Sequence, residues 1–318
     1  MPTVVCHGEL LIDFVPTVSG VDLIEAPAFK KAAGGGVANV SVGLARLGVS
    51  SGFMGQVGDD PFGHFLGMTL AQAGVDTSTL SFSSEARTML AFVALKADGE
   101  RDFIFYRNPS ADMLYRPDQV DQAYVRDATL LHVSSISTIS EPARSATLLA
   151  IETARAAGRL VSFDPNLRLN LWPSAEAARE GILSLWPLAH IIKAGDEELH
   201  FLTGETDFHR AAEQLWHPEL KVLLVTHGRE GSTYITPKFT GSVPGFRVES
   251  VDTTGAGDGF TAAALKGLLE HADAYDNPAT LAEICRFANA VGAITTTERG
   301  GIPALPTAAQ VDAFLAGR

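Results

Sequence analysis

The stretch from Asp252 to Asp258 (DTTGAGD) combines residue types that phosphate chemistry needs. Gly255 and Gly257 lack Cβ atoms, so their N–H groups can point together at an anion. The apolar run 260–269 predicts a helix, whose N-terminus adds unpaired N–H donors and a positive dipole end at the same place. Asp258 falls in the first turn of that helix. A carboxylate there can take the proton of an attacking hydroxyl, as phosphoryl transfer requires.

Each part of this pattern also has a purely structural explanation. Asp is favoured in the first turn of any helix, and a Gly-Ala-Gly sequence often forms only a tight turn. On this stretch alone, the phosphate cradle and the structural turn both remain open, so the other motifs have to be weighed with it.

A glycine run near the N-terminus offers a second place for a ligand. Residues 33–36 (AGGG) lead into a predicted helix, where Asn39 presents a donor and an acceptor to hydroxyl groups. Asp13 comes after a predicted buried strand, and its carboxylate can accept hydrogen bonds from two vicinal hydroxyls. A flexible loop and a turn residue are the structural alternatives for these two motifs.

Three charged segments follow predicted strands of the second half of the chain, at residues 164–168, 193–198 and 226–231. Ligands of open α/β sheets bind outside the carboxyl ends of the strands, so we expect these segments to converge on one crevice. Lys193 and Arg168 would supply local positive charge, and Glu198 can hold Mg²⁺ through water. Taken separately, each side chain also suits a solvated surface position.

Several other chemistries are poorly supported. The chain has no Gly-Lys dipeptide, which excludes a Walker-type phosphate loop, and residues 255–259 (GAGDG) do not match G-x-G-x-x-G. Residues 48–52 (GVSSG) match the hydrolase pattern around Ser50, but there a helix ends and a strand begins, the reverse of the order an elbow needs. The nine histidines show no close ligand pairing, so zinc catalysis is disfavoured.

The elements that must position these motifs alternate along the chain. Helical spacing or helix-end signals occur at residues 37–47, 62–73, 142–157 and 175–186, and strand signals at 4–7, 52–57, 130–133, 160–163, 190–193 and 222–226. Such alternation predicts an α/β fold with a mostly parallel sheet covered by helices on both faces. Strands at 88–95 and 102–106 flank residues 97–100 (ADGE), a hairpin signal. Together with the early strands they are a candidate separate element, either a lid or an edge hairpin.

Composition narrows the class of protein. The 318 residues are 46% hydrophobic and 19% charged, which suits a globular chain with a sizeable core. The net charge of −13 argues against nucleic acid or a membrane surface as a partner. Cys6 and Cys285 have no zinc-type spacing and suggest a reducing compartment, and no signal run or 18-residue apolar stretch occurs. We therefore expect a cytoplasmic protein.

Taken together, Gly34-Gly35-x-x-x-Asn39 and the Asp252–Asp258 stretch resemble the two signatures of the PfkB, or ribokinase-like, carbohydrate kinases. The resemblance covers essentially the whole chain, 1–318. Longer segments are similar to the fructokinase branch, namely residues 105–114 (FYRNPSADML), 164–168 (DPNLR), 171–174 (LWPS) and 243–246 (VPGF). The resemblance implies a ribokinase-like α/β domain with a small β lid, contributed by roughly 9–33 and 86–112. It also implies transfer of the ATP γ-phosphate to the 6-hydroxyl of fructose.

Residue roles carried over from the family follow the matching positions. Asp258 would be the base, and Gly255, Ala256 and Gly257 with the Asp258 N–H would form the anion hole. Sugar hydroxyls would be held by Asp13, Gly34, Gly35 and Asn39, with Arg107 reaching in from the lid and Arg168 nearby. The ATP and Mg²⁺ side would comprise Lys193, Glu198, Thr226, Gly228, Gly231 and Asn289.

Some expectations from the resemblance are less complete. Relatives commonly carry Asn-x-x-Glu where this chain has Gly195-Asp-Glu-Glu198, so one water-mediated contact to Mg²⁺ is missing. Many relatives bind K⁺ through a loop that corresponds to Asp252 and Thr254, with backbone near Gly300. Lid sheets of relatives often pair into homodimers, and the apolar alternation at residues 89–93 would allow this, although core packing explains it equally.

Alternatives to a fructokinase remain at this point. Another sugar kinase, for ribose or 2-keto-3-deoxygluconate, or a nucleoside kinase would use the same motifs, and Asp-x-Asn-x-Arg at residues 164–168 also suits keto-sugar acid kinases. The alternative from a different class is a non-catalytic binding module of this fold, and a hydrolase using Ser50 is a distant third.

Overall fold

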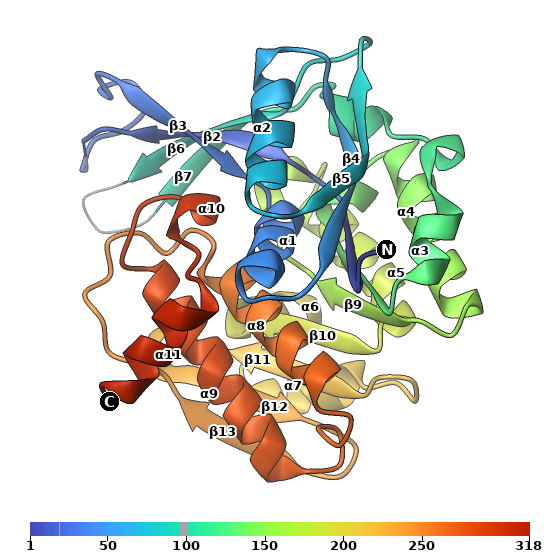
Figure 1. Ribbon diagram of the computed structural model, residues 1–318, viewed down its shortest axis with the longest axis vertical. Helices are drawn as coiled ribbons and strands as arrows, with labels where there is room; N and C mark the ends of the chain where they lie inside the picture. The colour runs from blue at the N-terminus through green and yellow to red at the C-terminus, as the bar shows by residue number, and fades with distance from the viewer. Residues whose placement is uncertain (19, 96–100) are drawn as a thin grey trace.

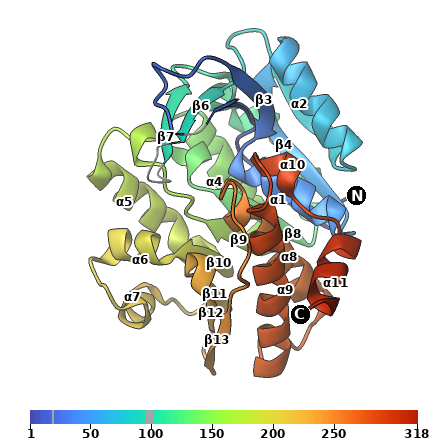
Figure 2. The ribbon, with the colours of Figure 1, turned by 90° about the vertical axis from the view of Figure 1, so that its left-hand side faces the viewer.

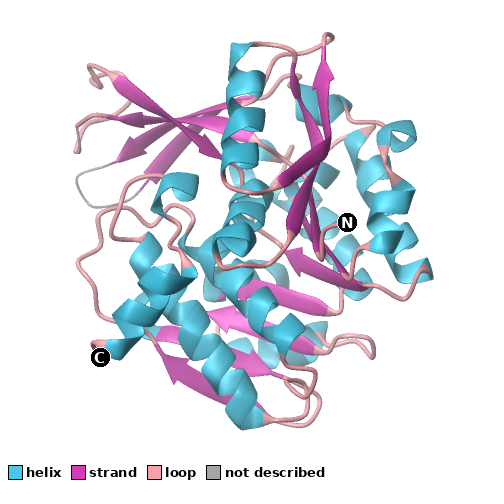
Figure 3. Cartoon of the chain, viewed as in Figure 1, coloured by secondary structure: helices cyan, strands magenta, loops and turns pink. Residues whose placement is uncertain are grey.

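The computed structural model describes residues 1–18, 20–95 and 101–318, and its strands form two separate sheets (Figures 1 and 3). The larger sheet has nine strands in the order β13-β12-β11-β10-β9-β8-β1-β4-β5. All neighbouring strands from β11 to β5 pair in parallel, whereas β12 and β13 add an antiparallel edge. The predicted mostly parallel α/β sheet is therefore confirmed.

The inner strands of the larger sheet are short and largely buried, as expected when helices cover both faces, whereas the edge strands β5 and β13 are more polar. Strand β1 is buried at every position, and β8 is as well. The nine strands are β1 (Val4–His7), β4 (Ser51–Gly58), β5 (Asp76–Ser83), β8 (Leu130–Ser134), β9 (Leu160–Asp164), β10 (Ile191–Gly195), β11 (Val222–Thr226), β12 (Gly231–Ile235) and β13 (Thr240–Pro244).

Two helical layers pack on the larger sheet, each with its own apolar cluster. One layer contains α1 (Gly36–Arg46), α2 (Pro61–Gln72), α8 (Ala256–Glu270), α9 (Pro278–Thr295) and α11 (Ala308–Ala316). The other contains α3 (Gln122–Asp127), α4 (Ala143–Ala156), α5 (Ala175–Leu185), α6 (Asp196–Thr203) and α7 (Phe208–Leu215). Figure 2 shows α8, α9 and α11 on one side of the strands and α5, α6 and α7 on the other. Helix α10 (Gly301–Ala304) is a single turn that packs near the smaller sheet.

The smaller sheet stands apart from the larger one and has the strand order β3-β2-β6-β7. Its strands are β2 (Leu11–Pro16), β3 (Phe29–Gly34), β6 (Leu90–Leu95) and β7 (Arg101–Tyr106). Strands β6 and β7 pair antiparallel. The predicted hairpin turn at residues 97–100 lies outside the described residues.

The structure corrects the expectation for Asp13 and contains several helices and strands that the sequence did not predict. Asp13 was expected after the first strand, in a turn or ligand-binding loop, but it lies inside β2 and is buried. The prediction at Ser50 is confirmed, because Ser50 lies between the end of α1 and the start of β4. Strands β5, β12 and β13 and helix α9 were not predicted. Within the described residues, no helix is long and apolar enough to cross a membrane.

Candidate active site

The N-terminus of α8 is built as an open donor site. Gly255 precedes the helix in the left-handed region, with φ of 79°, and a Cβ there would lie 2.9 Å from the Gly301 Cα, so only glycine fits. No side chain caps the helix. The N–H groups of Gly257 and Asp258 have no acceptor in the described part of the chain. Unpaired donors at a helix N-terminus, together with its dipole, suit an anion.

Asp258 lies in the first turn of α8, as predicted, and contacts the other signature directly. Asn39 Nδ2 donates a hydrogen bond of 2.7 Å to Asp258 Oδ2. Asn39 belongs to α1, which packs along α8. Burial raises the pKa of Asp258 to about 7, and the charge of Asp164 adds to the rise, whereas the Asn39 hydrogen bond and the charges of Lys193 and Arg168 oppose it. A carboxylate with this pKa can accept and release a proton near neutral pH.

A largely but not fully buried cation lies beside the α8 N-terminus. Lys193, on β10, places Nζ 3.3 and 3.4 Å from the two carboxylate oxygens of Asp164. A Cβ on Gly257 would be 3.1 Å from the same Nζ, so the ammonium lies directly against the helix start. Burial alone would lower the pKa of Lys193, but the charges of Asp164, Glu198 and Asp258 raise it above its ordinary value. Lys193 therefore stays protonated and brings positive charge to the open N–H groups.

Glu198 joins two of the predicted loops. Its Oε1 accepts a hydrogen bond of 2.8 Å from the Leu167 N–H, and its Oε2 accepts one of 2.8 Å from the Gly195 N–H. The adjacent Arg168 donates from Nη1 to the Leu167 carbonyl at 2.9 Å. The ends of β9 and β10 therefore meet, as expected for segments at the carboxyl ends of parallel strands.

A second group of predicted residues surrounds the end of β11. Gly228 and Gly231 both have positive φ, and a Cβ on Gly231 would approach the Val243 carbonyl to 2.1 Å. Asn289, on α9, donates to the same Val243 carbonyl at 3.1 Å and to that of Pro244 at 3.3 Å. Thr226 is the last residue of β11 and pairs with Gly195 of β10. Gly231 and Asn289 therefore meet at the end of β13, and Thr226 lies at the ends of the neighbouring strands β10 and β11.

Asp252, Thr254 and Gly300 also meet. Asp252 Oδ1 accepts hydrogen bonds from the Thr254 N–H at 3.0 Å and the Thr254 hydroxyl at 2.7 Å. Asp252 Oδ2 accepts one of 2.9 Å from the Gly300 N–H. The loop before α8 is thereby tied to the turn before α10.

The smaller sheet contributes Asp13 and Gly34. A Cβ on Gly34 would lie 2.1 Å from Asp13 Oδ2, so the glycine makes room for that carboxylate. Arg107, which follows β7, is nearly buried and donates from Nε to Asp112 Oδ2 at 2.9 Å and from Nη2 to the Ile136 carbonyl at 3.0 Å. Within the described residues, Arg107 hydrogen-bonds to these two groups. It makes no hydrogen bond there to another residue that was predicted to bind the sugar.

Sequence reasoning missed several residues that hold this arrangement. Glu9 contacts the start of α1, and Asp112 pairs with Arg107. His227 lies between Thr226 and Gly228, with Nδ1 2.5 Å from Asp196 Oδ1 and Nε2 2.9 Å from Thr233 Oγ1. Glu9 and His227 each follow a buried strand, and this position was a signal that the sequence offered. Their partners could not be predicted, because most of them are distant in sequence.

Known proteins resemble this chain over its whole length. The sequence profile of the pfkB family carbohydrate kinases matches residues 1–308. Probable fructokinase-3 of Arabidopsis thaliana is 54% identical over 313 residues, covering 98% of this chain and 91% of that protein. Fructokinase-2 of Solanum lycopersicum is 53% identical over 315 residues, covering 99% and 96%.

Solved structures resemble the fold equally well. The fructokinase of Xylella fastidiosa with bound ATP superposes with a TM-score of 0.91 at 36% identity, covering 100% of this chain and 99% of that one. The fructokinase of Vibrio cholerae O395, in a form with fructose, ADP and calcium ion bound, gives 0.88 at 36% identity, covering 99% of each. The fold is therefore ribokinase-like, and this chain belongs to the pfkB family of carbohydrate kinases, which makes it an ATP-dependent sugar kinase.

Proposed function

We propose that this protein transfers the γ-phosphoryl group of ATP to the 6-hydroxyl of D-fructose, giving fructose 6-phosphate and ADP. The observation that carries the proposal is the meeting of Asp258, the open N–H groups of α8 and Asn39 at one point. The fructokinase names of the relatives, at 53–54% identity over nearly the whole chain, support fructose as the acceptor.

Asp258 acts as the general base in this proposal. It takes the proton of the sugar hydroxyl while that oxygen forms a bond to the γ-phosphorus and the bond to the ADP oxygen breaks. The stretch from Gly255 to Asp258 forms the anion hole for the phosphoryl oxygens. In it the N–H groups of Gly257 and Asp258 are open, whereas that of Ala256 also donates to the Thr253 carbonyl at 3.3 Å. The positive charge of Lys193 lies beside this hole and attracts the phosphate chain of the nucleotide.

The sugar lies between α1 and the smaller sheet. Asp13, Gly34, Gly35 and Asn39 hold its hydroxyls, and Asn39 has a free acceptor for one of them, because its Oδ1 is buried without a hydrogen-bond partner in the described part of the chain. Arg107 and Arg168 contact the sugar from the lid side and from the loop after β9. Arg107 is already fixed by Asp112, so it offers a preorganised guanidinium.

The nucleotide lies over the ends of β10 and β11, with Thr226, Gly228 and Gly231 lining its site and Asn289 near the base. Glu198 organises Mg²⁺ through water, and the fit is reasonable because each carboxylate oxygen accepts a single backbone N–H and keeps a lone pair. Oxygen ligands with retained waters are what Mg²⁺ prefers. When bound, Mg²⁺ would neutralise charge on the phosphate oxygens.

A K⁺ site next to the anion hole is a further part of the proposal. Asp252 and Thr254, with backbone near Gly300, form an oxygen-rich loop whose members already contact one another. Hard monovalent and divalent cations favour such oxygen donors. Bound K⁺ would steady the loop that leads into α8.

The whole chain, 1–318, acts as one kinase domain in which the smaller sheet, with segments near 9–33 and 86–112, closes over the sugar and excludes water. Its outer face carries exposed Ile104 and Tyr106, which suit pairing with a second copy into a homodimer. Two buried free cysteines, Cys6 and Cys285, suit the reducing cytoplasm.

Coupled ADP release with ATP and Mg²⁺ tests the proposal against a panel of fructose, ribose, glucose, mannose, 2-keto-3-deoxygluconate and adenosine. A clear kcat/KM preference for fructose supports it. Preference for another acceptor keeps the kinase mechanism and replaces the substrate. Folded protein that is silent across the panel with K⁺ present would contradict the mechanism itself.

A further inference from the structure

Glu9 is a buried carboxylate that the proposed reaction does not use. It lies between β1 and β2 and is fully inaccessible to solvent. Its Oε1 accepts hydrogen bonds from the Gly36 N–H at 2.7 Å and the Val37 N–H at 3.4 Å, and its Oε2 accepts one of 3.1 Å from the Ser134 hydroxyl. These contacts connect the end of β1 to the start of α1 and to the end of β8.

Helix α1 depends on Glu9 because it has no cap of its own. Its N-cap is Gly35, and its first turn contains no acidic residue. The helices α2, α5, α9 and α11 each begin with a side chain that caps the helix locally, namely Asp60, Ser174, Asn277 and Thr307. The start of α8 lacks a local cap as well, but there the N–H groups stay open for the phosphoryl group. The start of α8 is therefore open, whereas the start of α1 is filled by Glu9.

The backbone of the glycine run also rests on Glu9. Gly35 has φ of 111°, and a Cβ there would lie 2.6 Å from the Glu9 carbonyl oxygen. A Cβ on Gly36 would be 2.2 Å from Asn166 Nδ2 and 3.3 Å from Glu9 Oε1. The backbone at Gly35 and Gly36 therefore lies directly against the main chain and the side chain of Glu9.

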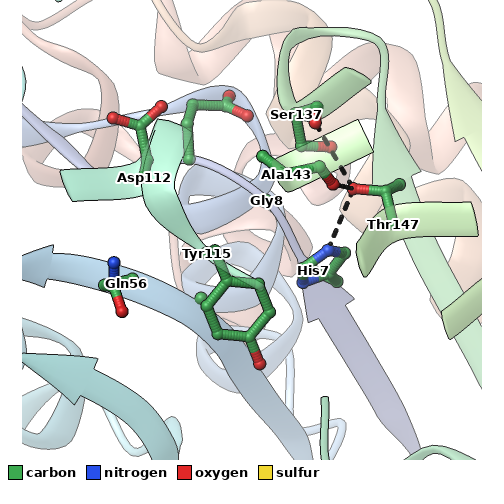
Figure 4. Close-up of a pocket in the computed structure, with 10 residues that line it drawn as sticks. His7, Gly8, Gln56, Asp112, Tyr115, Ser137, Ala143 and Thr147 are labelled. Carbon is green, nitrogen blue, oxygen red and sulfur yellow. Dashed lines mark hydrogen bonds between the residues drawn. The ribbon is translucent and has the colours of Figure 1, made fainter. Parts of the chain in front are cut away.

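The surroundings of Glu9 disfavour the ionised form of its side chain, so the carboxylate is not explained by fold stability. Burial raises the pKa of Glu9, and the hydrogen bonds from Ser134 and Val37 and the charge of Arg107 oppose the rise only in part. Glu9 and Asp112 both line a small cavity. Figure 4 shows this cavity, with His7, Gln56, Tyr115 and Thr147 among the labelled residues that line it. Because burial disfavours the ionised form of Glu9 in the fold, a neutral side chain of the same shape should not destabilise the protein.

We propose that Glu9 is a positioning residue for the sugar site. Its carboxylate fixes the first turn of α1, and through that turn it sets Gly34, Gly35 and Asn39 in register with Asp258. The proposal rests on the proposed function, because it assigns the sugar to this side of the site. A shift of the α1 start would move the hydroxyl-binding groups and leave the nucleotide loops after β10 and β11 in place.

The test is Glu9→Gln, which keeps the shape and removes the charge. We expect the KM for fructose to rise about tenfold, because small displacements of positioning groups have effects of this size or larger, while the KM for ATP stays within about twofold. The melting temperature should stay the same or rise. Ser134→Ala removes one hydrogen bond to the carboxylate and should raise the sugar KM several-fold, which gives a second and milder variant.

Asp60→Asn is the matched control. Asp60 is also a nearly buried carboxylate that accepts two N–H bonds at a helix start, from Phe62 at 3.0 Å and Gly63 at 2.9 Å. Although burial opposes it, hydrogen bonds including those from Thr88 and Gly63 lower the pKa of Asp60, so this charge stabilises the fold. Asp60→Asn should therefore lower the melting temperature, but it should not raise the KM for fructose relative to the KM for ATP.

Two outcomes would overturn the inference. One is a Glu9→Gln enzyme and a Ser134→Ala enzyme that both have the wild-type sugar KM. The other is a rise of both KM values together with a lower melting temperature, which describes a purely structural residue. The wild-type protein, measured alongside, separates this inference from the proposed function. If it has no activity on fructose, the proposed function is contradicted. The KM values of the variants are then compared with the acceptor of the panel that the enzyme does use.

Discussion

Asn39 and Asp258 are 219 residues apart in the chain and meet through a hydrogen bond of 2.7 Å, from Asn39 Nδ2 to Asp258 Oδ2. The other polar atom of the same amide, Oδ1, is buried and has no partner within the described residues. An unsatisfied buried acceptor costs about 1–3 kcal/mol. One amide thus orients the proposed base and keeps an acceptor ready for a hydroxyl of the substrate.

Asn39→Ala should affect both sugar binding and the base. Loss of the acceptor should raise the sugar KM about tenfold or more. Loss of the donor removes a hydrogen bond that lowers the pKa of Asp258, so the acidic limb of the kcat/KM profile should move to higher pH. Steady-state kinetics between pH 6 and 9 measure both effects, with Asn277→Ala, a helix cap elsewhere, as the control. If the acidic limb did not shift, Asn39 would not influence the pKa of Asp258, and this part of the account would be wrong.

The wild-type enzyme should lose catalytic efficiency below neutral pH. Burial holds the pKa of Asp258 at about 7, so protonation removes the base as the pH falls through that value. The kcat/KM for the sugar, which reports groups of the free enzyme, should then fall about tenfold per pH unit on the acid side. A kcat/KM that stays flat from pH 8 to pH 5 would contradict the assignment of Asp258 as the titrating group.

Arg107→Ala should raise the KM for the sugar more than the KM for ATP. The guanidinium belongs to the smaller sheet's side of the site and is held by Asp112, with both side chains nearly buried. Removing it also leaves Asp112 unpaired, which costs about 3–5 kcal/mol of stability. Arg155→Ala, which breaks an ion pair with Glu219 at the periphery, is the control. A larger rise in the ATP KM would place Arg107 on the nucleotide side.

Lys193→Met should slow phosphoryl transfer and weaken ATP binding. The ammonium lies against Gly257 at the open start of α8, and preorganised groups of this kind contribute about 10²–10³ in rate. Its charge also lowers the pKa of Asp258, so the acid limb should move upward as well. Lys221→Met serves as the control, because Lys221 is an exposed lysine just before β11, at the amino end of that strand. Wild-type kcat and ATP KM would show that Lys193 only pairs with Asp164.

Elements with local signals were predictable from the sequence. The helix that carries Asp258 was found because glycines precede an apolar run. Helix α1 was found because apolar and small residues at helical spacing end at Gly48, which has φ of 88° in the structure. Strand β5 was missed since its sequence, DTSTLSFS, is mostly polar and half-exposed at the sheet edge, where the apolar pattern is weak. The start of α9 did carry a signal, an Asn277 cap followed by Pro278.

Contacts between distant residues could not be predicted in the same way. Strand order places the ends of β9, β10 and β11 together, and this general rule was enough to group the charged segments. The partners of Glu9 and Arg107, by contrast, depend on how two sheets and a helix pack. Asp13 shows the same limit: its burial within β2, over Gly34, follows from pairing of β2 with β3 rather than from any feature of its own segment.

The most direct test of the central claim is the turnover of Asp258→Asn. The amide keeps the shape and still accepts the Asn39 hydrogen bond, but it cannot take a proton from the sugar. We expect the binding of sugar and of ATP, measured by calorimetry, to stay near wild type while kcat falls about 10²–10⁴-fold. Near-normal kcat in a preparation free of wild-type enzyme would contradict the role of Asp258 as the base.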